Sequence, residues 1–89
     1  MFFKKTDSWP IRIKLYSKPD CHLCEEIKRT LHSVSAQFEF NVEEVNILES
    51  ESLYEKFKWE IPVIYINGRK AFKYQMSKEA LIKRLKREA

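Results

Sequence analysis

Apolar and polar residues alternate near the start of the chain. The segment from Ile11 to Tyr16 has a period of two and carries β-branched residues, which is typical of a strand with one buried face. A strand is therefore predicted over 11–17, followed by a turn. From Cys21 to about Gln37 the apolar residues recur at spacings of four, four and three, which predicts an amphipathic helix. These residues are Leu23, Ile27, Leu31 and Val34.

The middle of the chain predicts a strand and a short helix. Apolar residues from Phe40 to Ile47 alternate imperfectly, and the acidic pair at 43–44 indicates a bulge in this second strand. Ser50 and Ser52 are candidate N-caps for a helix over about 51–58.

The last third of the chain predicts a hairpin and a final helix. The run from Ile61 to Ile66 is strongly apolar, and the Asn67-Gly68 pair that follows it is a strong signal for a tight turn. A further strand is expected at about 69–74. Ser77 is a candidate N-cap for an amphipathic last helix.

The predicted order of elements is βαβαββα. The strand–helix–strand unit implies a parallel pair and the hairpin an antiparallel pair, so we expect an α/β fold with a mixed sheet covered by helices. With 89 residues, the chain fits one domain over 1–89, with a core at about 10–87 and an N-terminal extension over 1–9.

Composition narrows the possible functions. The single glycine excludes Gly-rich phosphate loops, which need at least two. Seventeen basic and thirteen acidic residues give a formal charge of +4, and much of the positive charge lies at 78–87. We interpret this cluster as the solvated face of the last helix, with no nucleic-acid partner, although an interaction domain that binds through this helix stays open.

The compartment in which a protein resides determines whether its cysteines are expected to be reduced. The first residues lack the apolar run of a signal peptide, and no stretch is long and apolar enough for a membrane span. We therefore expect a cytoplasmic protein without a membrane partner. In a reducing compartment, two cysteines are better suited to chemistry than to a permanent structural bridge.

Cys21 and Cys24 form a Cys-x-x-Cys motif at the start of the first predicted helix. The attacking species in disulfide exchange is a thiolate, and a helix N-terminus stabilises negative charge. Cys21 is thus predicted to be the more acidic, nucleophilic thiol. Cys24 would then attack a mixed disulfide on Cys21 and release the reduced product.

Three charged or titratable residues flank the motif. Lys18 could stabilise a thiolate or bind a substrate carboxylate, and a protonated His22 would also favour the thiolate. Asp20 would oppose both effects unless its side chain turned away to cap the helix. His32 lies well along the helix, and we expect a structural or solvent-facing role for it.

A metal site is an alternative use of the cysteines. One chain offers too few thiols and histidines for a closed tetrahedral zinc site, and no metal ligand is predicted within it. Two copies would supply four thiolates, so a metal or iron–sulfur cluster shared between chains stays open. Inert cysteines are a further alternative.

Pro62 interrupts an apolar strand pattern, where it donates no ladder hydrogen bond. A cis Ile61–Pro62 bond would accommodate it, and a trans proline at the start of an edge strand would do so too.

These motifs together resemble a known family. The segment Tyr16–Cys24, the segment Ile61–Val63 and the Asn67-Gly68 pair, in their βαβαββα frame, are similar to a glutaredoxin of the thioredoxin-like superfamily, over about residues 10–87. The resemblance implies a four-stranded mixed sheet flanked by three helices. It also implies substrate-binding roles for Lys18, which would help to hold glutathione, for the cis-proline Pro62, and for the backbone of Ile61.

The chain also departs from that family. His22-Leu23 stands where Pro-Tyr is usual, and Phe72 and Lys73 stand near the positions of a Gly-Gly pair that an aspartate normally follows. Part of the usual cradle for glutathione is therefore missing. We expect a monomeric thiol–disulfide oxidoreductase without a tightly bound cofactor. It would reduce protein or glutathione mixed disulfides, with glutathione as a possible co-substrate and a thiol system as reductant.

Overall fold

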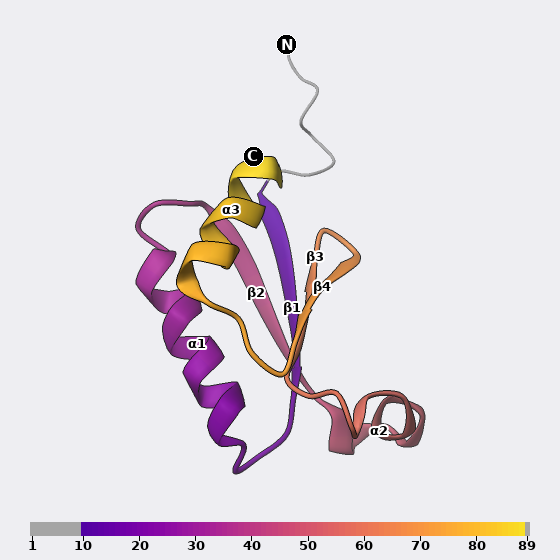
Figure 1. Ribbon diagram of the computed structural model, residues 1–89. Coiled ribbons are helices and arrows are strands. Elements are labelled where there is room, and N and C mark those ends of the chain that lie inside the picture. The colour runs from indigo at the N-terminus through magenta and orange to yellow at the C-terminus, as the bar shows by residue number, and fades with distance from the viewer. Residues whose placement is uncertain (1–9, 89) are drawn as a thin grey trace.

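A computed structural model describes residues 10–88, and the predicted extension over 1–9 lies outside this range. The elements follow the predicted order, with a short 3-10 helix added before the second α-helix (Figure 1). They are β1 (Ile11–Ser17), α1 (His22–Val34), β2 (Phe40–Asn46), η2 (Ile47–Glu49), α2 (Glu51–Phe57), β3 (Val63–Ile66), β4 (Arg69–Lys73) and α3 (Lys78–Glu88).

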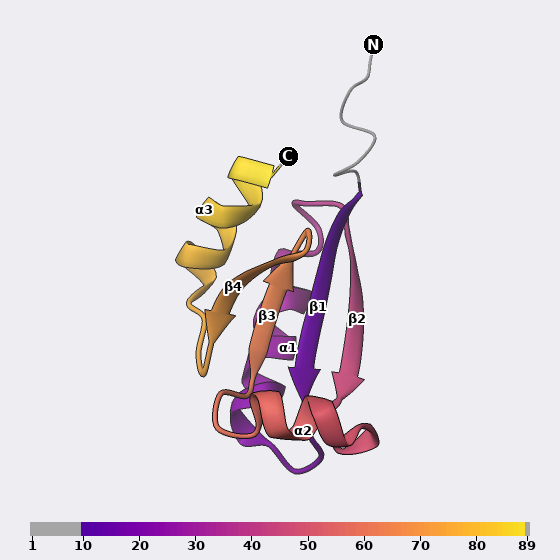
Figure 2. The same ribbon diagram turned by 90° about the vertical axis from the view of Figure 1, so that its right-hand side faces the viewer.

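The strands form one four-stranded sheet in the order β2-β1-β3-β4 (Figure 2). β1 pairs with β2 in parallel and with β3 in antiparallel, and β3 pairs with β4 in antiparallel. The predicted mixed sheet with three α-helices is confirmed. Because β1 and β3 run in opposite directions, the end of β1 and the start of β3 meet at one edge of the sheet, where Tyr16 pairs with Val63.

α1 and α3 lie together on one face of the sheet, as Figure 1 shows. The alternation in β1 buries Ile11, Ile13 and Leu15 against these helices. α1 contributes Ile27, Leu31 and Val34 to the same core, and α3 contributes Leu81 and Leu85. Each fully buried aliphatic side chain of this kind contributes roughly 1.5–3 kcal/mol to folding, so this layer supplies most of the apolar burial.

α2 packs at one end of the opposite face, beneath the strands in Figure 2. Phe57 at its last turn is only 2% exposed. Its ring stacks on Tyr16 with centroids 4.4 Å apart and meets Tyr65 edge-on at 6.2 Å. Ser50 is the N-cap of α2, since its hydroxyl accepts from the amide of Leu53. The aromatic contacts fix α2 to the same end of the sheet at which β1 ends.

The end of α1 and the course of β2 differ from the prediction. α1 ends at Val34. The next residue, Ser35, is the C-cap, and both its amide and its hydroxyl donate hydrogen bonds to the carbonyl of His32. The predicted bulge in β2 is wrong, because every residue from Phe40 to Asn46 pairs in register with β1. β2 is an edge strand, so its exposed acidic residues need no bulge to reach solvent. The irregularity lies instead in the β3–β4 pair, at Ile64/Tyr65.

The turn between β3 and β4 is hydrogen-bonded to β1 and to the end of α3. Asn67 and Gly68 both have positive φ, of 51° and 84°, as the predicted tight turn requires. The Asn67 side chain accepts from the Arg12 amide at 2.9 Å and donates to Glu88 Oε1 at 2.8 Å. Arg84 binds the other oxygen of Glu88 at 3.1 Å. The turn therefore ties β1 to the end of α3.

Because these hydrogen bonds involve Glu88, they make the free energy of unfolding depend on pH in the acidic range. The hydrogen bond from Asn67, aided by Arg84, lowers the pKa of Glu88 below its ordinary value of 4.5. A carboxylate with a lowered pKa stabilises the fold above its unfolded pKa, and this contribution is lost as pH falls through the folded pKa. We expect Glu88→Gln to lose stability at neutral pH and to lose less than wild type on acidification. Urea unfolding from neutral pH to pH values below 4.5 measures this; identical pH profiles would contradict it.

α3 begins at the predicted cap, since the Ser77 hydroxyl accepts from the Ala80 amide at 3.0 Å. Its basic side chains line the outer face, with Lys83, Lys86 and Arg87 exposed. None of the helices within residues 10–88 is long and apolar enough to span a bilayer.

Candidate functional site

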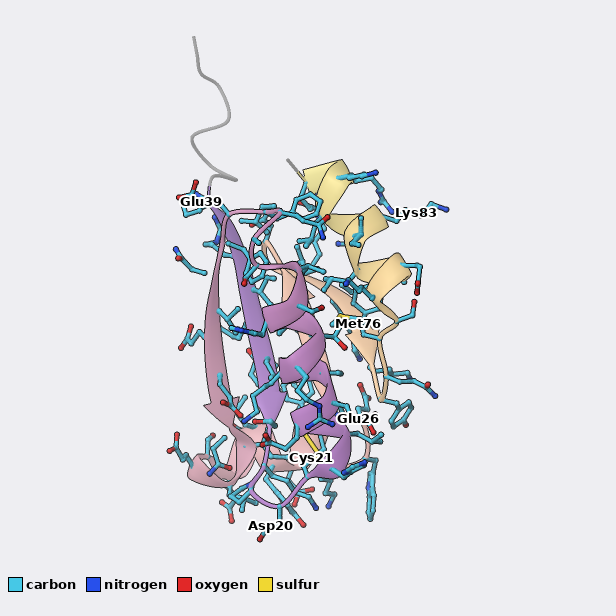
Figure 3. The ribbon with its side chains drawn as sticks, turned by 90° about the vertical axis from the view of Figure 1, so that its left-hand side faces the viewer. Asp20, Cys21, Glu26, Glu39, Met76 and Lys83 are labelled. Carbon is cyan, nitrogen blue, oxygen red and sulfur yellow. A yellow bond between two sulfur atoms is a disulfide. The ribbon has the colours of Figure 1, made fainter. Side chains whose placement is uncertain are left out.

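The two cysteines lie where β1 leads into α1, and they form a disulfide (Figure 3). Their Cα atoms are 5.2 Å apart. Cys21 is half-buried, whereas Cys24 is only 1% exposed. The structure thus leaves Cys21 partly accessible to solvent and encloses Cys24 within the protein.

Cys21 is also the N-cap of α1. Its backbone is extended, and its sulfur accepts a hydrogen bond from the Cys24 amide at 3.2 Å. An amide donor at the positive end of a helix stabilises a thiolate once the disulfide is reduced. This geometry is compatible with the predicted roles, in which Cys21 attacks first and the buried Cys24 attacks a partner already bound to Cys21. The two roles stay predictions.

The Asp20 side chain does not cap α1, because Cys21 holds that position. Asp20 is exposed and has a φ of 59°. His22 is also exposed, and its Nε2 lies 2.9 Å from a carboxylate oxygen of Glu26. That imidazole is paired with Glu26 along the helix surface. Lys18 is exposed in the turn between β1 and α1.

Pro62 is buried and follows a cis peptide bond from Ile61. Pro62 comes directly before β3, at the end of the sheet where β1 stops and the chain turns into α1. Pro62 and the cysteine motif therefore lie at the same end of the sheet. The Pro62 carbonyl accepts from the Tyr74 amide at 2.8 Å. The Ile61 amide donates to the Phe57 carbonyl at 3.2 Å, so this N–H is already used within the protein. The substrate-binding roles of Lys18, Ile61 and Pro62 stay predictions.

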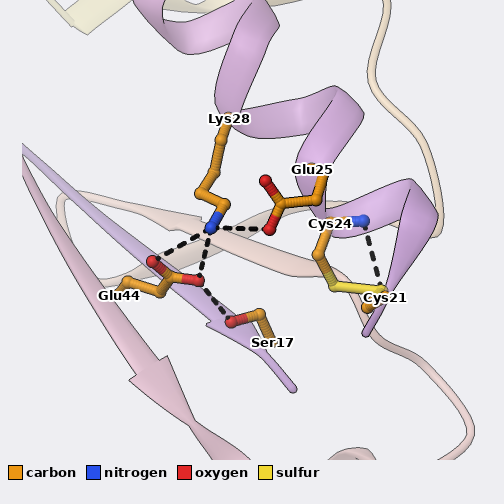
Figure 4. The surroundings of a disulfide bond; sticks show 6 residues. All are labelled: Ser17, Cys21, Cys24, Glu25, Lys28 and Glu44. Atoms are coloured by element: carbon orange, nitrogen blue, oxygen red, sulfur yellow. Dashed lines mark hydrogen bonds and ion pairs between the residues drawn. A yellow bond between two sulfur atoms is a disulfide. The ribbon is translucent and has the colours of Figure 1, made fainter. Parts of the chain in front are cut away.

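A polar network lies beside the disulfide (Figure 4). Ser17, at the end of β1, is only 2% exposed, and its hydroxyl donates to Glu44 Oε2 at 2.8 Å. Lys28 binds the same carboxylate at 3.2 Å and Glu25 at 2.8 Å. These hydrogen bonds, first to Glu25 and then to Glu44, raise the pKa of Lys28 above 10.5. The network ties β1 and β2 to the first turns of α1.

Sequence reasoning missed this network. The partners Ser17 and Glu44 are 27 positions apart and meet only through the β1–β2 register. One signal was present in the sequence. Ser17 follows Ile11, Ile13 and Leu15 on the inward side of β1, and a polar residue at a buried position needs a hydrogen-bond partner.

A hollow of about 320 Å³ opens beside the network. Most of its charged lining is acidic, with Glu25, Glu44 and Glu49 facing Lys18 and Lys28. Among residues 10–88, no group of three or more histidine, cysteine or acidic side chains is placed to hold a metal ion. The alternative of a metal or cluster shared between two chains stays a hypothesis.

Comparisons with known proteins agree with this geometry. A family model described as "Glutaredoxin-like domain (DUF836)" matches residues 12–86. A Dictyostelium discoideum protein, named "Glutaredoxin-like protein YDR286C homolog", is 29% identical over 77 residues, which span 80% of this chain and 71% of that protein.

Two solved structures are similar in fold. The solution structure of protein Ne2328 from Nitrosomonas europaea superposes with a TM-score of 0.74 at 24% identity, covering 85% of this chain and 92% of that one. A mutant thioredoxin from Halobacterium salinarum has a TM-score of 0.65 at 14% identity, covering 93% and 78% of the two chains.

Proposed function

The chain belongs to the glutaredoxin-like domain family and has a thioredoxin-like fold, and from this premise we propose that it is a small thiol–disulfide oxidoreductase. The observation that carries the proposal is the pair Cys21 and Cys24. One half-buried sulfur caps a helix and accepts an amide hydrogen bond, and the other sulfur is buried within bonding distance of it. Such a pair suits two successive exchange steps.

The proposed reaction starts from the reduced dithiol. The Cys21 thiolate attacks one sulfur of a substrate disulfide, forms a mixed disulfide and releases the other substrate sulfur as a thiolate, which takes up a proton. Cys24 then loses its proton and attacks the Cys21 sulfur. The Cys21–Cys24 disulfide forms and the second substrate sulfur leaves as a thiol. Two electrons pass from protein to substrate, and the resulting protein state is the one in the structure.

The partners follow from this chemistry. The substrate is a disulfide in a protein or a mixed disulfide with glutathione, and no tightly bound cofactor is needed. A thiol reductant, with glutathione as one possible co-substrate, returns the protein to its dithiol form. Such a cycle requires a reducing compartment, which fits the expectation of a cytoplasmic protein.

A trapping experiment tests the proposal. In Cys24→Ala the attacking sulfur remains but the second step is blocked, so reduced variant mixed with oxidised insulin should accumulate a mixed disulfide through Cys21. Alanine suits the apolar, buried position of Cys24. Mass spectrometry under non-reducing conditions detects the adduct, and dithiothreitol should release it. The variant that also carries Cys21→Ser is the control. If wild type reduces no disulfide and Cys24→Ala forms no adduct, the proposed function is wrong.

A further inference from the structure

Large apolar side chains are exposed in the cysteine motif and in the two segments next to Pro62. Leu23 lies between the two cysteines and is 42% exposed, Tyr74 is 43% exposed, and Trp59 is 78% exposed. We call these three residues the apolar rim. Exposed apolar surface gathered next to a reactive group marks a place where a partner binds, because its burial is favourable only when something covers it.

The rim residues are neighbours in space. The Tyr74 hydroxyl donates to the Trp59 carbonyl at 2.8 Å, which links the chain before Pro62 to the chain after β4. The Tyr74 amide donates to the Pro62 carbonyl at 2.8 Å. Tyr74 and Leu23 line one groove. The rim therefore runs from the cysteine motif along the proline segment.

Tyr74 is held in an unusual backbone conformation. Its φ is 70°, in the left-handed region that residues other than glycine rarely adopt. Such conformations persist where surrounding contacts hold them, and they concentrate at functional sites. Here the two hydrogen bonds of Tyr74 fix its ring beside the motif. Tyr74 is thus held in place before a partner binds.

The groove between α1 and residues 74–77 has a volume of about 160 Å³. A cavity of about 150 Å³ holds a benzene ring, so the groove has room for one large apolar side chain. Ile27 and Met76, both nearly buried, contribute apolar surface to it beside Leu23, and Thr30, Gln75 and Ser77 line its polar side. In Figure 3, Glu26 lies between Cys21 and Met76, and Glu26 also lines the groove.

Glutathione does not match the apolar rim. This tripeptide is small, carries carboxylates at both ends and has no apolar side chain that could cover the rim. The acidic side chains near the disulfide are largely paired, since Glu26 lies 2.9 Å from His22 Nε2 and Lys28 binds both Glu25 and Glu44. The preference therefore rests on burial: an apolar side chain gains free energy by covering the rim, and glutathione does not.

We infer that the substrate is a protein disulfide flanked by an apolar side chain, in preference to glutathione. The segment with the disulfide would place its cysteine at Cys21, its apolar neighbour in the groove, and further apolar surface against Trp59. The inference rests on the proposed function and assigns its substrate class. The exchange steps are those given above.

The test compares three disulfides under one assay. Two are synthetic peptides of equal length with one internal disulfide, identical except that leucine flanks a cysteine in one and serine in the other; the third is oxidised glutathione. For wild type we expect kcat/KM about 10-fold higher with the leucine peptide than with the serine peptide, as burial of one apolar side chain allows. Oxidised glutathione should be the poorest of the three.

Substitutions in the apolar rim test whether these residues cause the preference for the leucine peptide. Leu23→Ser and Trp59→Ser should each reduce the leucine-to-serine ratio by at least about 3-fold, since each removes part of the apolar surface. Val42→Ser is the matched control, because Val42 is exposed to 44% on edge strand β2 and lies outside the rim; its ratio should equal that of wild type.

The results distinguish a wrong substrate class from a wrong proposed function. If all three disulfides turn over equally, or the rim variants keep the wild-type ratio, the inference is wrong and the proposed function stands. If wild type reduces none of the three, the proposed function fails and the inference fails with it.

Discussion

Cys21→Ser loses disulfide reduction by about 10³-fold or more, because the nucleophile of the first step is removed. The variant should fold as wild type does. Serine is a preferred helix N-cap, so its hydroxyl can accept the hydrogen bond from the Cys24 amide that the Cys21 sulfur accepts in the structure. Loss of activity would therefore report the missing sulfur and not a damaged helix. Steady-state reduction of insulin with dithiothreitol measures the effect, with circular dichroism as the folding check.

Cys24→Ala is the matched comparison, because it removes the other sulfur and leaves the first attack possible. It should form the mixed disulfide at a rate close to wild type and then release it slowly. If Cys21→Ser kept full turnover, or if that variant formed the mixed disulfide through Cys24, the assignment of roles would be wrong.

Phe57→Ala destabilises the fold by about 3–5 kcal/mol, the range for removing a buried aromatic side chain. Phe57 is almost fully buried and stacks between α2 and the sheet against Tyr16 and Tyr65. Small domains have about 5–15 kcal/mol of stability in total, so this one substitution should lower the urea midpoint strongly. The loss should be accompanied by release of α2, measured as faster amide exchange over 51–57.

Tyr54→Ala on the same helix is the control. Tyr54 is 40% exposed, and surface substitutions usually change stability by no more than about 0.5 kcal/mol. Equal midpoints for Phe57→Ala and Tyr54→Ala would show that the aromatic cluster does not hold α2.

The fold could be predicted because its main signals are local. The alternation over Ile11–Tyr16 determines which face of β1 is buried, and the Asn67-Gly68 pair has the backbone that its turn demands. The order of elements then leaves few topologies. Ser50 and Ser77 cap helices as expected, for the same reason.

The surroundings of the cysteines could be predicted only in part. The sequence places both sulfurs at a helix start, but the bond from Ser17 to Glu44 depends on a register between two strands. The bond from Tyr74 to Trp59 likewise joins two loops that only the folded sheet brings together. Such contacts carry no periodic signal, so they remain hidden until the fold is known.

The most direct test of the account is a single turnover without added reductant. Fully reduced protein is mixed with excess disulfide peptide, and the thiols on each partner are counted and mapped by mass spectrometry. The account predicts that each chain loses its two thiols, that the peptide gains two, and that Cys21 and Cys24 end joined within one chain. Protein thiols that stay reduced, or that end in disulfides between two chains, would contradict it.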